Sequence, residues 1–202
     1  FHHRDMRDTT VRQFAKRYHV DTVQSRRVEA LALELLVALD GNLATEESIR
    51  QRLSWAAQLH EIGLTVAHTG YHKHSAYILG NADMPGFSRM EQAQLALLVL
   101  AHRGTLEKVR ALVGNSSNWP LIMALRLACL FHRTRGPLEV PVLEAIQRER
   151  RFDVHLPAAW LKRYPLTAAA LKSEIKEWKG VGFELRIPSL DEMDIDVDPA
   201  AE

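Results

Sequence analysis

Histidines gather in one stretch of this sequence. Of the ten in the chain, five lie between positions 60 and 102: His60, His68, His72, His74 and His102. Neutral imidazole is a common ligand of divalent metals, and protonated imidazole binds phosphoryl oxygens as Lys and Arg do. His60 is followed by Glu61, which places a carboxylate beside an imidazole, and Lys73 stands between two histidines. The stretch therefore predicts either a metal centre or a phosphate site.

Helical periodicity tells us which elements position these side chains. One amphipathic helix carries His60 on its apolar face, close to its end. The capping-box pair Ser88 and Glu91 begins a second helix that reaches His102. Between the two helices, residues 72–74 fall in a glycine-containing, histidine-rich loop that leads into a short helix. Two helix ends and one loop are thus expected to supply the polar groups.

The pair His60-Glu61, followed by further histidines and helices, resembles the HD superfamily of metal phosphohydrolases. In that superfamily an early His, a His-Asp pair and a later Asp bind the metal. The matching positions here are Gln24, His60, Glu61 and Cys129, so two of the four ligands remain. A catalytic metal centre needs about three protein ligands. We therefore expect the scaffold of that superfamily with its metal chemistry lost, and no metal-ligating residue.

A longer set of motifs resembles a more specific family. The motifs are Trp55-Ala-Ala-x-Leu-His60-Glu61-x-Gly63-Leu64, His68-x-Gly70-x-His72-x-His74-Ser75-Ala-Tyr77-Ile-Leu79, Leu125-Arg126-Leu127, Arg4-Asp5-x-Arg7 and Trp178-x-Gly180-Val-Gly-Phe183-x-Leu185. They are similar to the C-terminal domain of bacterial exopolyphosphatases, in the exopolyphosphatase / guanosine pentaphosphate phosphohydrolase family. The resemblance covers residues 4–187.

This resemblance implies which domains of the parent protein carry catalysis and which bind the substrate. The full enzyme is a homodimer that removes terminal orthophosphate from inorganic polyphosphate with Mg²⁺, and its catalytic groups lie in N-terminal actin-like domains. The present chain has no Gly-rich phosphate loop and does not begin with Met, so we interpret it as the end of a longer protein. It is expected to have no catalytic residue and no cofactor, to bind polyphosphate and to dimerise. The candidate polyphosphate-binding residues are His72, Lys73, His74 and Arg103, with Arg4, Arg7 and Arg126 as further candidates.

The apolar pattern changes along the chain and indicates a mainly α protein with a small α+β part. Helical periodicity dominates residues 1–136, which we predict to be an HD-like helical bundle. Alternating apolar residues in 137–187 predict a small αβ subdomain with a two- or three-stranded antiparallel sheet. Residues 188–202 contain six acids and no Lys or Arg, a composition typical of a disordered tail.

Composition narrows the class of function. A chain of 202 residues that is 47% hydrophobic and 25% charged is an ordinary globular protein. Residues 1–8 are mostly polar and charged and do not resemble a signal peptide, and no apolar run reaches about 20 residues, so we do not expect a membrane as a partner. One cysteine suits a reducing compartment, here the bacterial cytoplasm. The net charge is +1, but without the acidic tail 26 basic residues face 19 acidic ones, a net +7 that favours a polyanion. Nucleic acid is not expected as a partner.

Several alternatives stay open from the sequence alone. Each candidate also has a structural alternative to a binding role. His60 could be a hydrogen-bonded core residue, and His68 and His74 could form hydrogen bonds that hold their loop. Glu61 could form an ion pair with Arg27. The parent enzyme as a guanosine pentaphosphate phosphohydrolase is the second functional hypothesis. A self-sufficient HD-type metal phosphohydrolase and a pure dimerisation module are the others.

Overall fold

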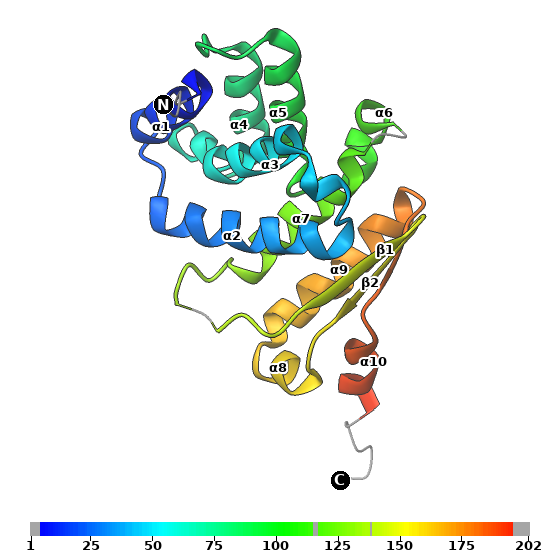
Figure 1. Ribbon diagram of the computed structural model, residues 1–202. Helices are drawn as coiled ribbons and strands as arrows, with labels where there is room; N and C mark the ends of the chain where they lie inside the picture. Colours follow the sequence, from blue (N-terminus) through cyan, green and yellow to red (C-terminus); the bar gives the residue numbers. More distant parts are fainter. Residues whose placement is uncertain (1–4, 115–116, 138, 196–202) are drawn as a thin grey trace.

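The computed structural model describes residues 5–114, 117–137 and 139–195 and shows a mainly helical protein with one small sheet (Figure 1). The α-helices are α1 Met6–Arg17, α2 Thr22–Leu39, α3 Glu47–Leu59, α4 Tyr71–Asn81, α5 Arg89–Ala101, α6 Arg110–Val113, α7 Asn118–Phe131, α8 Ala158–Arg163, α9 Pro165–Gly180 and α10 Pro188–Ile195. Three 3₁₀ turns, η1 Leu43–Thr45, η2 Ile62–Thr65 and η3 Leu106–Val109, lie between them. The strands are β1 Glu144–Arg148, β2 Arg151–His155 and β3 Glu184–Arg186. The predicted fold class, mainly α with a small α+β part, is confirmed.

Side-chain caps explain where several helices begin. The Asp5 carboxylate accepts a hydrogen bond from the first turn of α1, and Asp21 accepts one from the Gln24 amide at the start of α2. Ser88 and Glu91 form a complete capping box at α5, as predicted. Each cap satisfies backbone N–H groups that the first turn of a helix leaves without an internal partner.

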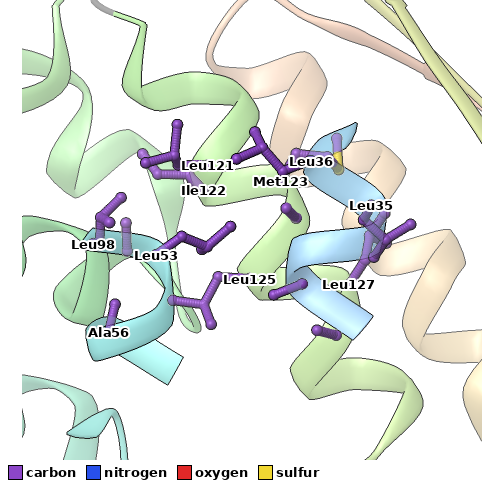
Figure 2. Packing of buried hydrophobic residues seen from close by; sticks show 14 of the residues in the cluster. Leu35, Leu36, Leu53, Ala56, Leu98, Leu121, Ile122, Met123, Leu125 and Leu127 are labelled. Atoms are coloured by element: carbon purple, nitrogen blue, oxygen red, sulfur yellow. The ribbon is translucent and has the colours of Figure 1, made fainter. Parts of the chain in front are cut away.

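Helix α7 lies at the centre of the fold. Every residue from Trp119 to Ala128 is buried, so the helix is enclosed on all sides. Figure 2 shows its leucines between side chains of α2 on one side and side chains of α3 and α5 on the other. The labelled core residues are Leu35, Leu36, Leu53, Ala56, Leu98, Leu121, Ile122, Met123, Leu125 and Leu127. Because α7 is fixed from both sides, the polar residues on it hold defined positions.

The sheet has the order β1-β2-β3 and is mixed. Strands β1 and β2 form an antiparallel hairpin, whereas β2 and β3 are parallel, with Phe152 opposite Leu185. The prediction of a purely antiparallel sheet is therefore wrong for β3. Helices α8 and α9 lie between β2 and β3 in sequence, and such a helical crossover returns the chain in the same direction.

The predicted disordered tail is wrong over its first half. Residues 188–195 form α10, which begins with a proline, a favoured first residue of a helix, and has Asp191 in its first turn. Leu190 is buried in the hydrophobic core. Residues 196–202 lie outside the described part. Counted over residues 1–195, 26 basic residues face 22 acidic ones, so the net charge is +4 instead of +7.

The helical part and the small αβ part share a hydrophobic core. Buried residues on both sides of the expected boundary at residues 136 and 137 belong to one contiguous cluster, which includes Leu125 of α7 and Trp178 of α9. Among the described helices, none combines the length and the hydrophobicity needed to cross a bilayer.

Candidate functional site

The ends of three helices meet at a polar cavity of about 710 Å³. His60 is the C-cap of α3, His102 is the C-cap of α5, and Cys129 lies on the last turns of α7. The cavity is lined mainly by polar and ionisable side chains, which are Gln24, His60, Glu61, His68, Tyr71, His102, Arg103, Arg126, Cys129, Arg133, Arg135 and Glu174. All four positions that correspond to the HD ligands, Gln24, His60, Glu61 and Cys129, therefore line one cavity.

A close contact between η2 and α4 fixes His60 and Glu61. The Ser75 hydroxyl donates to the His60 carbonyl oxygen and accepts from the Gly63 amide, both at 2.8 Å. Gly63 leaves no room for a side chain, because a Cβ there would lie 2.3 Å from the Tyr71 carbonyl oxygen. The glycine and serine of the sequence motifs are thus explained by the packing of two backbone segments.

The three residues His72, Lys73 and His74 lie in the first turn of α4 and not in a loop. Gly70 has a φ of 65°, a left-handed conformation that favours glycine, and the helix begins directly after it. Lys73 is exposed, whereas His72 and His74 are half-buried. The expected loop is therefore shorter than predicted, and it ends at Gly70.

His72 differs from its neighbours because it is neutral. Burial, together with the positive charges of Arg103 and Lys73, lowers its pKa to about 4. The ring lies against Gly104, where a Cβ would come within 3.1 Å of its Nε2 atom. Near pH 7 this imidazole offers a hydrogen bond to an anion but not the positive charge that we expected from it.

Glu61 and Gln24 are held by protein groups. Arg135 donates to both carboxylate oxygens of Glu61, at 2.6 and 3.2 Å, so the expected partner Arg27 is wrong. The Gln24 amide nitrogen donates to the His132 carbonyl oxygen at 2.7 Å, while its Oε1 atom is buried without a partner among the described residues. Hard cations such as Mg²⁺ prefer oxygen ligands, chiefly carboxylates. The only carboxylate among the HD positions is bound to arginine, so these residues do not fit Mg²⁺.

His60 and His102 are buried side by side. Each is 3% exposed, and the ring centroids lie 5.0 Å apart at a steep angle. The Nδ1 atom of His60 donates to the Ala57 carbonyl oxygen at 2.6 Å, and that of His102 donates to the Val99 carbonyl oxygen. Burial lowers the pKa of both histidines, so both rings are neutral near pH 7.

Two other histidines of the stretch lack such hydrogen bonds. Within the part of the chain that the structure describes, neither His68 nor His74 forms a side-chain hydrogen bond. His68 lies near the ring of Tyr71, with the centroids 6.1 Å apart. The alternative that these two histidines hold the loop in place by hydrogen bonds is therefore not supported.

The arginines around the cavity fall into two groups. Arg126 is 4% exposed and donates to both carboxylate oxygens of Glu174, at 2.7 and 2.9 Å, and Arg135 is paired with Glu61. Arg103 and Arg133 are exposed and have no carboxylate partner among the described residues. Only the second group has a positive charge available for a ligand.

The remaining candidates occupy other places. Arg7 pairs with Asp5 and Glu91, and Arg4 lies outside the described residues. The guanidinium of Arg103 lies 4.6 Å from the ring centroid of Tyr71, a cation–π contact. Sequence reasoning missed Tyr71, Arg133 and Arg135 as cavity residues, and the only signal was the position of Tyr71 inside the histidine motif.

Comparison with known proteins identifies the class first. The family model described as Ppx/GppA phosphatase, domain III, matches residues 6–175. A protein of Pseudoalteromonas translucida named guanosine-5'-triphosphate,3'-diphosphate pyrophosphatase is 34% identical over 188 residues, which cover 91% of this chain and 38% of that protein. Proteins of the same name from Vibrio cholerae and Vibrio atlanticus are each 33% identical and cover 91% and 94% of this chain.

This chain belongs to the Ppx/GppA phosphatase family, and it corresponds to the C-terminal domain of that family. The family expected from the motifs is thereby confirmed. The chain spans less than two fifths of the length of the curated relatives, 37–39% for those named above.

Proposed function

We propose that this chain is the polyphosphate-binding and dimerisation domain of an exopolyphosphatase that releases terminal orthophosphate. One observation supports polyanion binding above the others. Arg103 and Arg133 line the cavity, and Lys73 lies in the first turn of α4, the helix whose first residue, Tyr71, also lines it; all three are exposed and have no carboxylate partner among the described residues. Phosphoryl oxygens are bound by such cations, and several contacts along one chain add up to useful affinity.

The residues of this chain then bind and position the polyanion. Arg103 and Arg133 would contact phosphoryl oxygens at the cavity, and Lys73 would extend the contact along α4, whose positive N-terminal end lies beside it. His72 and His74 would add hydrogen bonds. Hydrolysis, together with its Mg²⁺, is assigned to the rest of the parent enzyme, because the described cavity carboxylates Glu61 and Glu174 are both bound to arginine.

Calorimetric titration with long-chain polyphosphate tests this proposal. The measurement is made on this chain at about 50 and 200 mM salt, where each phosphate contact adds about 0.7–0.9 to the slope of log K against log salt. We expect Lys73→Ala and Arg103→Ala each to weaken binding and to reduce that slope by roughly one contact. Lys16→Ala, an exposed lysine on α1, is the matched control. If the three variants bind equally well, the proposed site is wrong.

A homodimer is the second part of the proposal. Exposed apolar side chains gather beside α4, α5 and α6, where Tyr77 is 72% exposed, Met90 is 71% exposed and Leu112 is 65% exposed. A patch of this kind is common where proteins associate. Sedimentation velocity over a range of concentrations should show a dimer, and a monomer at all concentrations would contradict it.

A guanosine pentaphosphate phosphohydrolase is the second candidate for the parent enzyme. The names of the relatives favour it, since all those cited are called guanosine-5'-triphosphate,3'-diphosphate pyrophosphatase. The cationic residues described above suit either polyanion. Initial rates of the full-length enzyme on both substrates decide between them: a higher kcat/KM for guanosine pentaphosphate would replace the first candidate.

A further inference from the structure

Three metal-binding side chains meet at the inner end of the cavity. They are His60, His102 and Cys129, from the ends of α3 and α5 and from α7, and their ligand atoms all lie within 4.8 Å of one another. In a tetrahedral zinc site the bonds are about 2.0–2.1 Å to nitrogen and about 2.3 Å to sulfur, which places the donor atoms about 3.3–3.6 Å apart. Small shifts of the side chains close the difference.

Both imidazoles are already in the form that binds a metal. Because carbonyl oxygens only accept, the bonds to Ala57 and Val99 place the ring proton of each histidine on Nδ1. The lone pair of each ring then lies on Nε2, and a backbone acceptor on the opposite nitrogen is the arrangement that supports metal-ligating histidines. The Nε2 atom of His60 has no hydrogen-bond partner among the described residues.

A second, independent feature of the cavity also indicates a ligand. Gln24 is 4% exposed and lines the same cavity, and its Oε1 atom is buried without a partner in the described part of the chain. A buried oxygen without a partner costs free energy. A metal ion, or a water molecule bound to one, would satisfy it.

We propose that His60, His102 and Cys129 form a binding site for one zinc ion. Two imidazole nitrogens and one sulfur suit Zn²⁺ and exclude Mg²⁺ and Ca²⁺, which take oxygen ligands. The fourth position belongs to water or to Gln24. The site ties together the C-terminal ends of α3 and α5 and the last turns of α7, so its role is to stabilise the fold.

Binding changes the chemistry of two groups. Burial raises the pKa of the Cys129 thiol, so the metal must displace its proton. The S–H bond breaks, the sulfur electron pair forms the metal–sulfur bond, and one proton per ion passes to the solvent. The Tyr71 hydroxyl donates to His102 Nε2 at 3.1 Å, and the metal takes its place there.

Cobalt substitution tests the site directly. Co²⁺ bound to a thiolate gives an intense charge-transfer absorption in the near ultraviolet, and Cys129 is the one cysteine of the chain. We expect one Co²⁺ per chain with this band, its displacement by Zn²⁺, and its loss in Cys129→Ser and His102→Asn. The exposed His155 provides the control, because His155→Gln should keep the band. No thiolate band, or a band that survives in His102→Asn, would overturn the proposal.

A measurement on the unmodified chain avoids any doubt about folding of the variants. Zn²⁺ at about ten times its dissociation constant should slow alkylation of Cys129 about tenfold, since only the metal-free fraction reacts. Mg²⁺ at the same concentration should have no effect. An alkylation rate that Zn²⁺ leaves unchanged would refute the site whether or not the variants fold.

Discussion

The buried ion pair between Arg126 and Glu174 gives a prediction whose size follows from its environment. Arg126 is 4% exposed and Glu174 is 12% exposed, and the carboxylate accepts from Arg126 at 2.7 and 2.9 Å and from the Trp178 ring nitrogen at 3.1 Å. Glu174→Gln keeps the shape of the side chain but removes its charge. The new amide N–H₂ group replaces one acceptor oxygen and leaves Arg126 without a counter-ion.

The expected cost is about 3 kcal/mol in the free energy of unfolding. Removing one partner of a fully buried pair costs about 3–5 kcal/mol, and the lower end applies because Glu174 keeps some exposure. Losing one hydrogen bond to a charged group, about 1.5–3 kcal/mol, leads to a similar figure. With a urea m value of about 3 kcal/mol/M, the unfolding midpoint falls by about 1 M.

Urea unfolding followed by circular dichroism measures this change, and a second ion pair provides the control. Glu184 and Arg186 are also 2.7 Å apart, but their side chains are 58% and 52% exposed. Glu184→Gln should therefore leave the midpoint unchanged, because exposed pairs contribute little. If the two variants lower the midpoint equally, the argument that burial sets the strength of the pair is refuted.

Three further predictions concern the neighbourhood of the cavity. Gly63→Ala should lower the free energy of unfolding by about 3 kcal/mol in the same urea assay, because the new Cβ would meet backbone atoms. Gly180→Ala is the control: no atom lies within 4 Å of its new Cβ, so the free energy of unfolding should stay the same or rise by up to about 1 kcal/mol. Burial and the Arg27 charge lower the pKa of His132, so the stability that this residue contributes is present above its ordinary pKa of about 6.5 and is lost as the pH falls below that pKa. Between pH 7.5 and 5.5, His132→Gln should therefore lose less stability than wild type, and an equal loss would contradict this. Tyr71→Phe should raise zinc affinity about fivefold, because the hydrogen bond from the Tyr71 hydroxyl to His102 Nε2, worth about 1 kcal/mol, no longer competes with the metal. An affinity that stays the same or falls in a competition titration would count against the site.

Local patterns in the sequence predicted most of the helices and two of their N-terminal caps. Asp21 and the Ser88–Glu91 pair cap helices as expected, because capping depends on residues only three positions apart. The alternating residues 152, 154 and 156 likewise marked β2, the central strand. The direction of β3 was missed, since alternation is the same in parallel and antiparallel strands.

Contacts between distant residues were not predictable from local patterns. Glu61 pairs with Arg135, 74 positions away, and not with Arg27. The acidic composition of residues 188–202 outweighed the signal of Leu190, which is buried and helps to hold α10 in place. For the cavity, the motifs identified His60 and Cys129. The position of His102 beside them depends on how the ends of α3 and α5 meet, which a local pattern does not show.

The mixed sheet has a consequence for the order of folding. Strands β1 and β2 are joined by a short turn, so their pairing closes a small loop, while β3 reaches β2 only after residues 156–183 have folded into α8 and α9. Distant pairings form slowly because the entropy of closing a long loop is lost before contacts compensate for it. The hairpin should thus belong to the folding nucleus and β3 should join late. Substitutions in the β1–β2 turn will slow folding, and substitutions at Leu185 of β3 will mainly speed unfolding.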